Sequence, residues 1–590
     1  MNHRHLRRAG QILAIGAILL CSASCVEINE HIGENLIPTN QKWDVFSPEP
    51  EVLDNIVLKT SDSLSAYSSR RIAFGAVNDG SIGSMTKASS FTLVPVVKDI
   101  DLGTNTVVHQ FHFSAVRDTL STVNDNQQRM MQNVYVYSLK QPLDSTILYT
   151  NSLAEGVMTQ DGKETNRKRF IDIENYISMG IPVYNGGDSL SFDFTKEYTD
   201  KVVEAIREFK KISTEKKDTL LADYLKLVPG IYIETESPAG IGGRINMFDL
   251  ALEFDSGGYV SGNFAEMKLT ADYGDKKNVD TSFIFMYGPS SFLQKGSTSI
   301  PAQYAFNGSV HNLIKTEYQD GVAATDAIYV EGGSGVKPVI KAECIKRLVH
   351  DYIAAEGIVN PEEVVINKAS IILPYDVNGD WDKLDKYPAI LSPTVRLHGT
   401  SNGQKYVSYA GLTDASIESE NQGDIDRSLS RYSPDISHHV QEILKLKQND
   451  GESDEEFENR LAKYDIWMLI MHEEVTVTTT INNNNDYYNN LMYNSYYNNM
   501  MYDPYGYGYG YGGYGYGGYG YGGYGYGNYY NYMMMAAYAN SGTSTSESVS
   551  IDLDKDRYYR CTLAGPTASG DQQPKLKITF SAPKTAEKSE

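Results

Sequence analysis

Short segments in which apolar and polar residues alternate follow one another along most of the chain. They are rich in β-branched and aromatic residues, and Gly, Asn, Asp or Pro separates them, which is typical of strands joined by turns. They cover residues 56–58, 90–94, 107–113, 134–139, 230–234, 245–254, 267–270, 282–286, 327–330, 339–342, 364–373, 394–397, 466–471, 475–480 and 575–580. Because helical patterns rarely separate them, we predict a mainly β fold of antiparallel β-sandwich, jelly-roll-like domains with a few short helices.

One segment departs from this alternation. Across residues 199–227, apolar residues recur every three to four positions among charged residues, at Val202, Val203, Ile206 and Phe209. This spacing is typical of an amphipathic helix. We expect the helix to cover an edge or an end of a sheet.

The strands divide into two sets. A glycine-containing stretch, 74–83 in the first set and 330–337 in the second, precedes further strands in each, which suggests a weak internal repeat. We therefore predict a first domain at residues 48–290, with the helical insertion inside it, and a second domain at residues 300–585.

The chain begins with the pattern of an export signal. Residues 1–24 carry a basic start, an apolar run and small residues that a signal peptidase accepts. The apolar run is too short for the ~20 residues of a spanning helix. Cys25 follows, so the segment is similar to a bacterial lipoprotein signal and predicts Cys25 as the acylated lipid anchor, with residues 25–47 as a tether. Cys21 is a weaker rival site, and an ordinary secretory signal with two incidental cysteines is the other alternative.

The chain is strongly acidic. It has 75 Asp and Glu against 52 Lys and Arg, a formal net charge of −23. This charge has the wrong sign for contacts with a phosphate backbone, so we expect no nucleic-acid partner. Anionic lipid does not attract an acidic protein either, so we expect the acyl chains on Cys25 alone to hold it on the membrane. Outer-membrane proteins and glycans are the remaining candidate partners.

Two cysteines, Cys344 and Cys561, lie beyond the signal. The sequence contains no CxxC motif and no Cys/His ligand spacing, which argues against zinc and redox sites. Sequence alone does not place the two thiols within bonding reach of each other. Two buried free thiols are favoured over a disulfide.

A short acidic segment is a weak candidate for a calcium loop. Asp376, Asn378, Asp380 and Asp382 place oxygen ligands at alternating positions, as calcium loops do. The glycine at position 379 comes too early for an EF-hand, which is therefore excluded. A solvated Asp/Asn turn is favoured over a structural ion.

A pair of adjacent histidines, His438 and His439, lies in a predicted amphipathic helix. Adjacent helical residues point about 100° apart, so a shared metal ion would need distant ligands. We expect both histidines on the helix surface, without a metal.

The sequence contains no catalytic motif for a serine hydrolase or a zinc protease. Carboxylate pairs such as Glu362–Glu363 and Glu473–Glu474 are common in an acidic chain and predict solvated faces. A glycosidase pair is not recognisable from spacing alone. We predict a protein without catalytic activity or cofactor, and a carboxylate-dependent hydrolase of glycans is the less favoured alternative.

Residues 482–545 form a tract rich in Tyr, Gly and Asn. The tract holds 20 of the 44 tyrosines and few charges, so it is expected to be a disordered loop inserted in the second domain. The flanking segments 475–480 and 548–553 predict a hairpin beneath it. Tyrosine faces contact sugars and proteins, so the tract is either an adhesive loop or an insertion without a role. Its proposed contacts are Tyr507, Tyr511, Tyr516 and Tyr521.

Several segments spread over the chain carry a resemblance: 75–83, 134–149, 224–233, 364–369 and 574–578. Together they resemble the Bacteroidetes lipoprotein family catalogued as domain of unknown function 4270. The chain departs from the family at Val228-Pro229, where the family tends to have a bulky residue and Lys, and in the tract after Ile481, which looks like an insertion.

The resemblance implies a cell-envelope lipoprotein and no established reaction. Our expectation is a non-catalytic lipoprotein of the outer membrane, on its periplasmic or its outer face, that acts as a structural or binding component. A carbohydrate-binding surface lipoprotein is the alternative.

Overall fold

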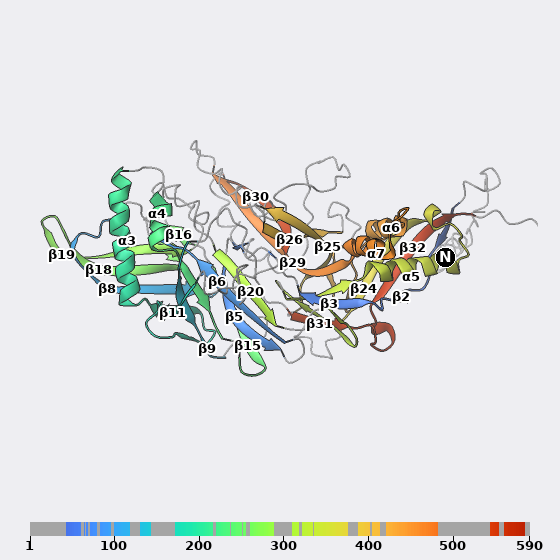
Figure 1. Cartoon of the computed structure of the whole chain (residues 1–590), viewed down its shortest axis with the longest axis horizontal. Helices are drawn as coiled ribbons and strands as arrows, with labels where there is room; N and C mark the ends of the chain where they lie inside the picture. Colours follow the sequence, from blue (N-terminus) through green and yellow to red (C-terminus); the bar gives the residue numbers. More distant parts are fainter. Residues whose placement is uncertain are drawn as a thin grey trace, which may run out of the picture.

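The computed structural model divides into two lobes at opposite ends of an elongated molecule (Figure 1). It describes residues 43–60, 64, 67–68, 71–79, 83–95, 100–117, 130–142, 171–215, 220–236, 238–249, 252–254, 260–287, 310–317, 321–333, 335–375, 387–401, 404–412, 421–481, 543–553 and 560–584. The paired strands of both lobes are antiparallel. No helix in these ranges is long and apolar enough to cross a membrane.

The first lobe is built from two sheets. The larger has the order β11-β10-β14-β6-β20-β4, with β5 beside β6 and β15 beside β5, and the smaller has the order β13-β8-β18-β19-β7. The larger sheet consists of β4 (Tyr67–Ser68), β5 (Arg71–Asp79), β6 (Gly83–Phe91), β10 (Tyr135–Leu139), β11 (Ile171–Tyr176), β14 (Ile231–Glu234), β15 (Gly242–Asp249) and β20 (Val310–Glu317). The smaller consists of β7 (Leu93–Pro95), β8 (Thr104–Val116), β13 (Ser189–Asp193), β18 (Phe264–Tyr273) and β19 (Lys276–Tyr287).

Two short ribbons and two helices complete this lobe. The ribbons are β9 (Gln132–Asn133) with β12 (Val183–Tyr184), and β16 (Leu252–Phe254) with β17 (Val260–Gly262). The helices α3 (Lys196–Glu215) and α4 (Leu220–Leu227) correspond to the predicted segment 199–227, and α3 begins three residues before it. Apolar residues of α3, including Val202 and Ile206, belong to the same core cluster as the inner faces of both sheets.

The second lobe also has two sheets. One has the order β21-β3-β23-β29-β25-β26, with β30 beside β29, and the other has the order β1-β32-β24-β28-β27, with β2 beside β32. The first consists of β3 (Ile56–Thr60), β21 (Val322–Ala323), β23 (Val336–Ile340), β25 (Ile390–Ser401), β26 (Gln404–Gly411), β29 (Ile466–Ile481) and β30 (Thr543–Leu553). The second consists of β1 (Trp43–Phe46), β2 (Glu51–Val52), β24 (Val365–Pro374), β27 (Ile425–Asp426), β28 (Arg431–Tyr432) and β32 (Lys575–Pro583).

Helices cover one side of this lobe. They are α5 (Ala342–Ala355), α6 (Ser437–Lys445) and α7 (Asp454–Leu461), with short 3₁₀ turns η8 (Pro361–Glu363), η10 (Ala462–Tyr464) and η11 (Gly570–Gln572). A ribbon of β22 (Ala327–Glu331) and β31 (Arg560–Ala564) completes it. The core joins residues of both sheets to the buried faces of α5 and α6. In Figure 1, α5, α6 and α7 gather beside β32, at the end far from α3.

The mainly β fold with few helices is confirmed, but the predicted division of the chain is wrong at two places. β1 pairs with β32 and β3 pairs with β23, so residues predicted as the end of the tether and the start of the first domain belong to the second lobe. Conversely, β20 pairs with β6 and belongs to the first lobe. Alternation within a strand carries no information about a partner several hundred residues away, so the pattern could not reveal these crossings.

The weak repeat does not correspond to equivalent structures. In the first lobe β5 and β6 form a hairpin, whereas β22 and β23 belong to different sheets. Gly75 in β5 has φ +147°, and a Cβ there would lie 2.1 Å from the carbonyl oxygen of Arg244 on β15. The glycine therefore allows two strands to approach closely, and it does not mark a repeated loop.

Candidate functional site

The residues predicted as lipid anchor, calcium ligands and adhesive contacts lie outside the described residues. Cys25 precedes them. The four possible calcium ligands, Asp376, Asn378, Asp380 and Asp382, and the four tract tyrosines, Tyr507, Tyr511, Tyr516 and Tyr521, also fall in ranges that the structure does not describe. No cluster of His, Cys, Asp or Glu among the described residues could hold a metal ion.

The predicted hairpin beneath the tyrosine-rich tract is confirmed. β29 and β30 pair along their length, from Met471 with Leu553 to Ile481 with Thr543. The two ends of the tract therefore leave the sheet side by side, at the end of one hairpin. Because β29 also pairs with β23 and β25, this hairpin is continuous with the centre of a sheet of the second lobe.

Cys344 and Cys561 are free and buried, as predicted. Cys344 lies on α5, and its Sγ donates a hydrogen bond to Oδ1 of Asp54 at 3.1 Å. Burial, and then this hydrogen bond, raise the pKa of Cys344 to about 11. A thiol that stays protonated at neutral pH is a poor nucleophile and metal ligand, so Cys344 is a packing residue.

The prediction for the histidine pair is wrong for one of its members. His438 is exposed, whereas His439 is buried on the inner face of α6. The Nε2 of His439 donates to the carbonyl oxygen of Tyr464 at 2.8 Å, since a carbonyl can only accept. Burial lowers the pKa of His439 to about 4, so the ring is neutral at pH 7. The sequence pattern predicted the apolar face of the helix, but it did not predict that the imidazole of His439 lies on that face.

The carboxylates at Glu362 and Glu363 behave as predicted. Both side chains are exposed. Glu362 pairs with Lys447, and Glu363 accepts a hydrogen bond from Asn360. Because both side chains are exposed and have these polar partners, the pair forms a solvated face.

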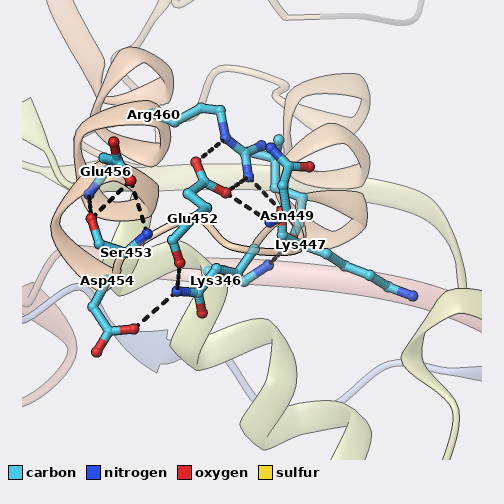
Figure 2. A network of polar contacts seen from close by, with 10 residues as sticks. Lys346, Lys447, Asn449, Glu452, Ser453, Asp454, Glu456 and Arg460 are labelled. Carbon is cyan, nitrogen blue, oxygen red and sulfur yellow. Dashed lines mark hydrogen bonds and ion pairs between the residues drawn. The ribbon is translucent and has the colours of Figure 1, made fainter.

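A dense polar network joins α5 and α7 through the loop between α6 and α7 (Figure 2). Arg460 donates to both carboxylate oxygens of Glu452, at 2.8 and 2.7 Å, and the backbone N–H of Asn449 donates to Glu452 Oε2 at 2.7 Å. Lys346 donates to the carbonyl oxygens of Ile443 and Leu446. The hydrogen bonds from Arg460, and then from the backbone N–H of Asn449, lower the pKa of Glu452 to about 2. These contacts hold the loop in place, and the donors and acceptors of the network are hydrogen-bonded to one another, which indicates a structural role.

Another buried group of charges lies where the lobes meet. Lys337 on β23 has no exposed surface, and its Nζ donates to the carbonyl oxygens of Glu331 and Gly335. A Cβ at Gly335 would lie 2.5 Å from Cε of Met85 on β6, so this turn of the second lobe packs against the first. Burial lowers the pKa of Lys337, and the nearby buried Lys87 lowers it further. The site is closed to solvent and has a structural role.

Among the described residues, a row of tyrosines with one exposed end lies on the first lobe. Tyr137 on β10 lies opposite Tyr176 on the edge strand β11 and opposite Tyr232 on β14. The ring of Tyr176 lies 5.2 Å from that of Tyr137 and 5.9 Å from that of Tyr135. Exposure rises toward the edge, from none at Tyr232 to 41% at Tyr176. We call Tyr135, Tyr137, Tyr176 and Tyr232 the tyrosine row.

Polar groups lie beside Tyr135 in the tyrosine row. Tyr135 donates its hydroxyl hydrogen to Oε2 of Glu236, and Asn133 Nδ2 donates to Oε1 of the same carboxylate at 2.6 Å. The hydrogen bond to Glu236, and then burial, raise the pKa of Tyr135, so its hydroxyl stays protonated. A half-exposed ring beside a carboxylate and an amide can contact the apolar face of a ligand and hydrogen-bond its hydroxyl groups.

The sequence contained part of the signal for this surface. Tyr135 and Tyr137 alternate within one predicted strand, and Tyr232 and Glu234 alternate within another. Alternation places each pair on one face, but only the pairing of β10 with β11 and β14 joins them.

Comparison with protein-family models, with curated proteins and with solved structures finds no match for this chain. Its resemblance to the lipoprotein family catalogued as domain of unknown function 4270 therefore stays a prediction.

Proposed function

We propose that the chain is a non-catalytic lipoprotein of the outer membrane, anchored through acylated Cys25, and that it serves as a structural or binding component of the cell envelope. The observation that carries the proposal is the position of β1. This strand begins at Trp43, 18 residues after Cys25, and pairs with β32 in the second lobe.

That spacing sets the reach of the anchor. At about 3.4 Å per extended residue, 18 residues span at most about 60 Å. Two or three acyl chains bind a membrane stably. The anchor would hold the second lobe close to the bilayer and leave the first lobe, at the other end of the molecule, farther away.

Replacement of Cys25 by Ala tests the anchor. In a Gram-negative host, metabolic labelling with a palmitate analogue should label the wild-type protein but not Cys25→Ala, and the variant should leave the outer-membrane fraction. The matched control is Cys21→Ala, which removes the rival cysteine and should be labelled and retained. Label on Cys25→Ala, or its loss from Cys21→Ala, would contradict the assignment of the anchor.

A second candidate function is the binding of a glycan, and the tyrosine row favours it. The exposed ring of Tyr176 lies at the edge of a sheet, with Glu236 and Asn133 next to Tyr135. Aromatic rings that stack on sugars, flanked by groups that bond hydroxyls, are suited to polysaccharides.

Affinity electrophoresis in gels that contain xylan, mannan or a β-glucan tests this function. If one of them retards the protein, Tyr176→Ala should weaken binding up to about tenfold, because one aromatic contact contributes up to about 1.5 kcal/mol. Trp43→Ala is the control, since it removes an exposed ring from the other lobe. Equal loss in both variants would exclude the tyrosine row. Absence of retardation, with co-purification of outer-membrane proteins, would favour an assembly component.

A further inference from the structure

The outer face of the sheet formed by β1, β32 and β24 exposes large apolar residues. Trp43 and Val365 are each 48% exposed, and Val45 is 64% exposed. Val45 and Val365 lie on either side of Ser581 in the same row, and Trp43 lies opposite Pro583 two residues further along β32. The three side chains therefore share one face at one end of this sheet.

The opposite face of the same strands is the core of the lobe. The ring of Phe46 on β1 stacks on that of Phe580 on β32 at 5.3 Å, and Ile366 on β24 belongs to the same core cluster. Because side chains alternate along a strand, Trp43 and Val45 must point away from this core.

Lysines continue the outer face along the sheet. Lys368 lies opposite Thr579, and Lys577 lies opposite Ser370, which places both on the same side as Val45 and Val365. Both are exposed, and Lys575, opposite Ile372, is half-buried. We call Trp43, Val45, Val365, Lys368, Lys575 and Lys577 the basic apolar face.

The charge of this face is opposite to that of the whole chain. The strands β1, β24 and β32 contain a single carboxylate, that of Asp44, which alternation places on the side of Phe46. Asp435 lies beside this sheet, because its backbone forms a β-bridge with Ser370. Its side chain is buried, however, and accepts two hydrogen bonds from Ser437. In a protein of net charge −23, a face with lysines and no carboxylate from its own strands is a local reversal of sign.

We propose that the basic apolar face lies against an anionic lipid surface and so orients the protein on its membrane. Tryptophan favours the boundary between headgroups and acyl chains. Lysines attract anionic headgroups within a Debye length, so the distant acidic surfaces matter little there. The length of the preceding chain supports this occupant: β1 itself carries Trp43 and Val45, within reach of Cys25. The proposal rests on the proposed lipid anchor, and it differs from our expectation that the acyl chains alone hold the protein on the membrane.

The test tethers the chain without acylation. A chain that starts at residue 26 and carries an N-terminal hexahistidine tag is held on vesicles by a nickel-chelating lipid. Bimane is attached to Val45→Cys or, as the matched control, to Val107→Cys. Val107 is an exposed valine (56%) on β8 in the other lobe, and the buried Cys344 and Cys561 should not react. The label at position 45 should shift to the blue and be quenched by brominated lipid on vesicles that contain phosphatidylglycerol, and the label at position 107 should not.

A charge reversal gives the second arm. Lys368→Glu with Lys577→Glu should reduce quenching at position 45 at least about tenfold, and high salt should act in the same direction. Equal quenching at positions 45 and 107, or no effect of the double variant, would overturn the proposal. A blue shift at position 45 without vesicles that grows with protein concentration would also overturn it, in favour of a second copy of the chain. Because the tag replaces the anchor, these results are independent of the labelling of Cys25.

Discussion

The cores of the two lobes are filled by different types of side chain. Among the described residues, the core of the first lobe contains eight phenylalanines, whereas that of the second contains one, Phe580, among mainly aliphatic side chains. In the first lobe, for example, the ring centroid of Phe113 lies 4.5 Å from that of Phe192 and 4.7 Å from that of Tyr287. In the second, Phe580 stacks on Phe46.

Both lobes combine two sheets with helices, since α3 and α4 contribute Val202, Ile206 and Leu225 to the first core, so the lobes differ in the type of side chain that fills the core. In the first lobe two sheets face each other, and large rings from both inner faces fill the layer between them. In the second lobe α5 and α6 add apolar residues such as Ile345, Leu348 and Ile443 to the core. Large rings concentrate stability in a few positions, whereas aliphatic side chains distribute it over many smaller contacts.

The largest expected effect is on the aromatic core. Phe113→Ala removes a fully buried ring and leaves a cavity, which should reduce the stability of the first lobe by about 3–5 kcal/mol. Hydrogen exchange followed by mass spectrometry should show faster exchange in peptides of β8 and β18, with β24 and β32 unchanged. Equal loss of protection in both lobes would break the comparison, because the lobes would then unfold as one unit.

Local alternation predicted most of the strands, because each half-buried strand shows its two faces in its own sequence. The helix α5 was missed: residues 339–342 were assigned to a strand, whereas β23 ends at Ile340 and α5 begins at Ala342. The signal was present, since Cys344, Ile345, Leu348, Val349, Tyr352 and Ile353 repeat with helical spacing and are all buried.

Pairing partners and buried charges could not be predicted in the same way. Val336 lies opposite Thr60, almost 280 residues earlier in the chain, and the turn at Gly335, before the buried Lys337, packs against Met85 on β6 of the other lobe. The tyrosine row likewise needs three strands that are separate in sequence. Such features depend on tertiary pairing, about which one strand contains no information.

A second prediction concerns acid sensitivity in the helical layer of the second lobe. His439 has a pKa of about 4 in the fold and about 6.5 when unfolded, so the unfolded chain binds the proton more readily. The stability of this lobe should be unaffected by His439 above pH 6.5, and should fall by about 3 kcal/mol as the pH falls from 6.5 to about 4. Hydrogen exchange of α6 peptides, corrected for the intrinsic rate at each pH, measures this loss.

Two variants separate the contribution of His439 from that of its neighbour His438. His439→Gln retains a donor for the carbonyl oxygen of Tyr464 and should remove this part of the pH dependence, whereas His438→Gln, at the exposed neighbour, should leave it unchanged. If both variants keep the full pH dependence, another group is responsible, and the helical layer is not the acid-sensitive part of this lobe.

The smallest expected effect tests how far the helical lobe depends on the ends of its helices. α7 begins with a capping box: the backbone N–H of Glu456 donates to Ser453 Oγ at 3.2 Å, and the N–H of Ser453 donates to Glu456 Oε2 at 2.9 Å (Figure 2). Ser453→Ala should cost about 1 kcal/mol and speed exchange in α7, because it leaves an N-terminal N–H without its partner.

Ser569 provides the matched control for this change. It occupies the same position before η11, but its side chain makes no capping hydrogen bond. Ser569→Ala should therefore have little effect, and Ser453→Asp should restore most of the protection in α7. A loss of protection in β8 or β18 on Ser453→Ala would contradict the comparison. The cap belongs to α7, which lies beside α5 and α6 at the end of the molecule far from α3 (Figure 1), so its loss should act on these helices of the second lobe and leave the aromatic core of the first unchanged.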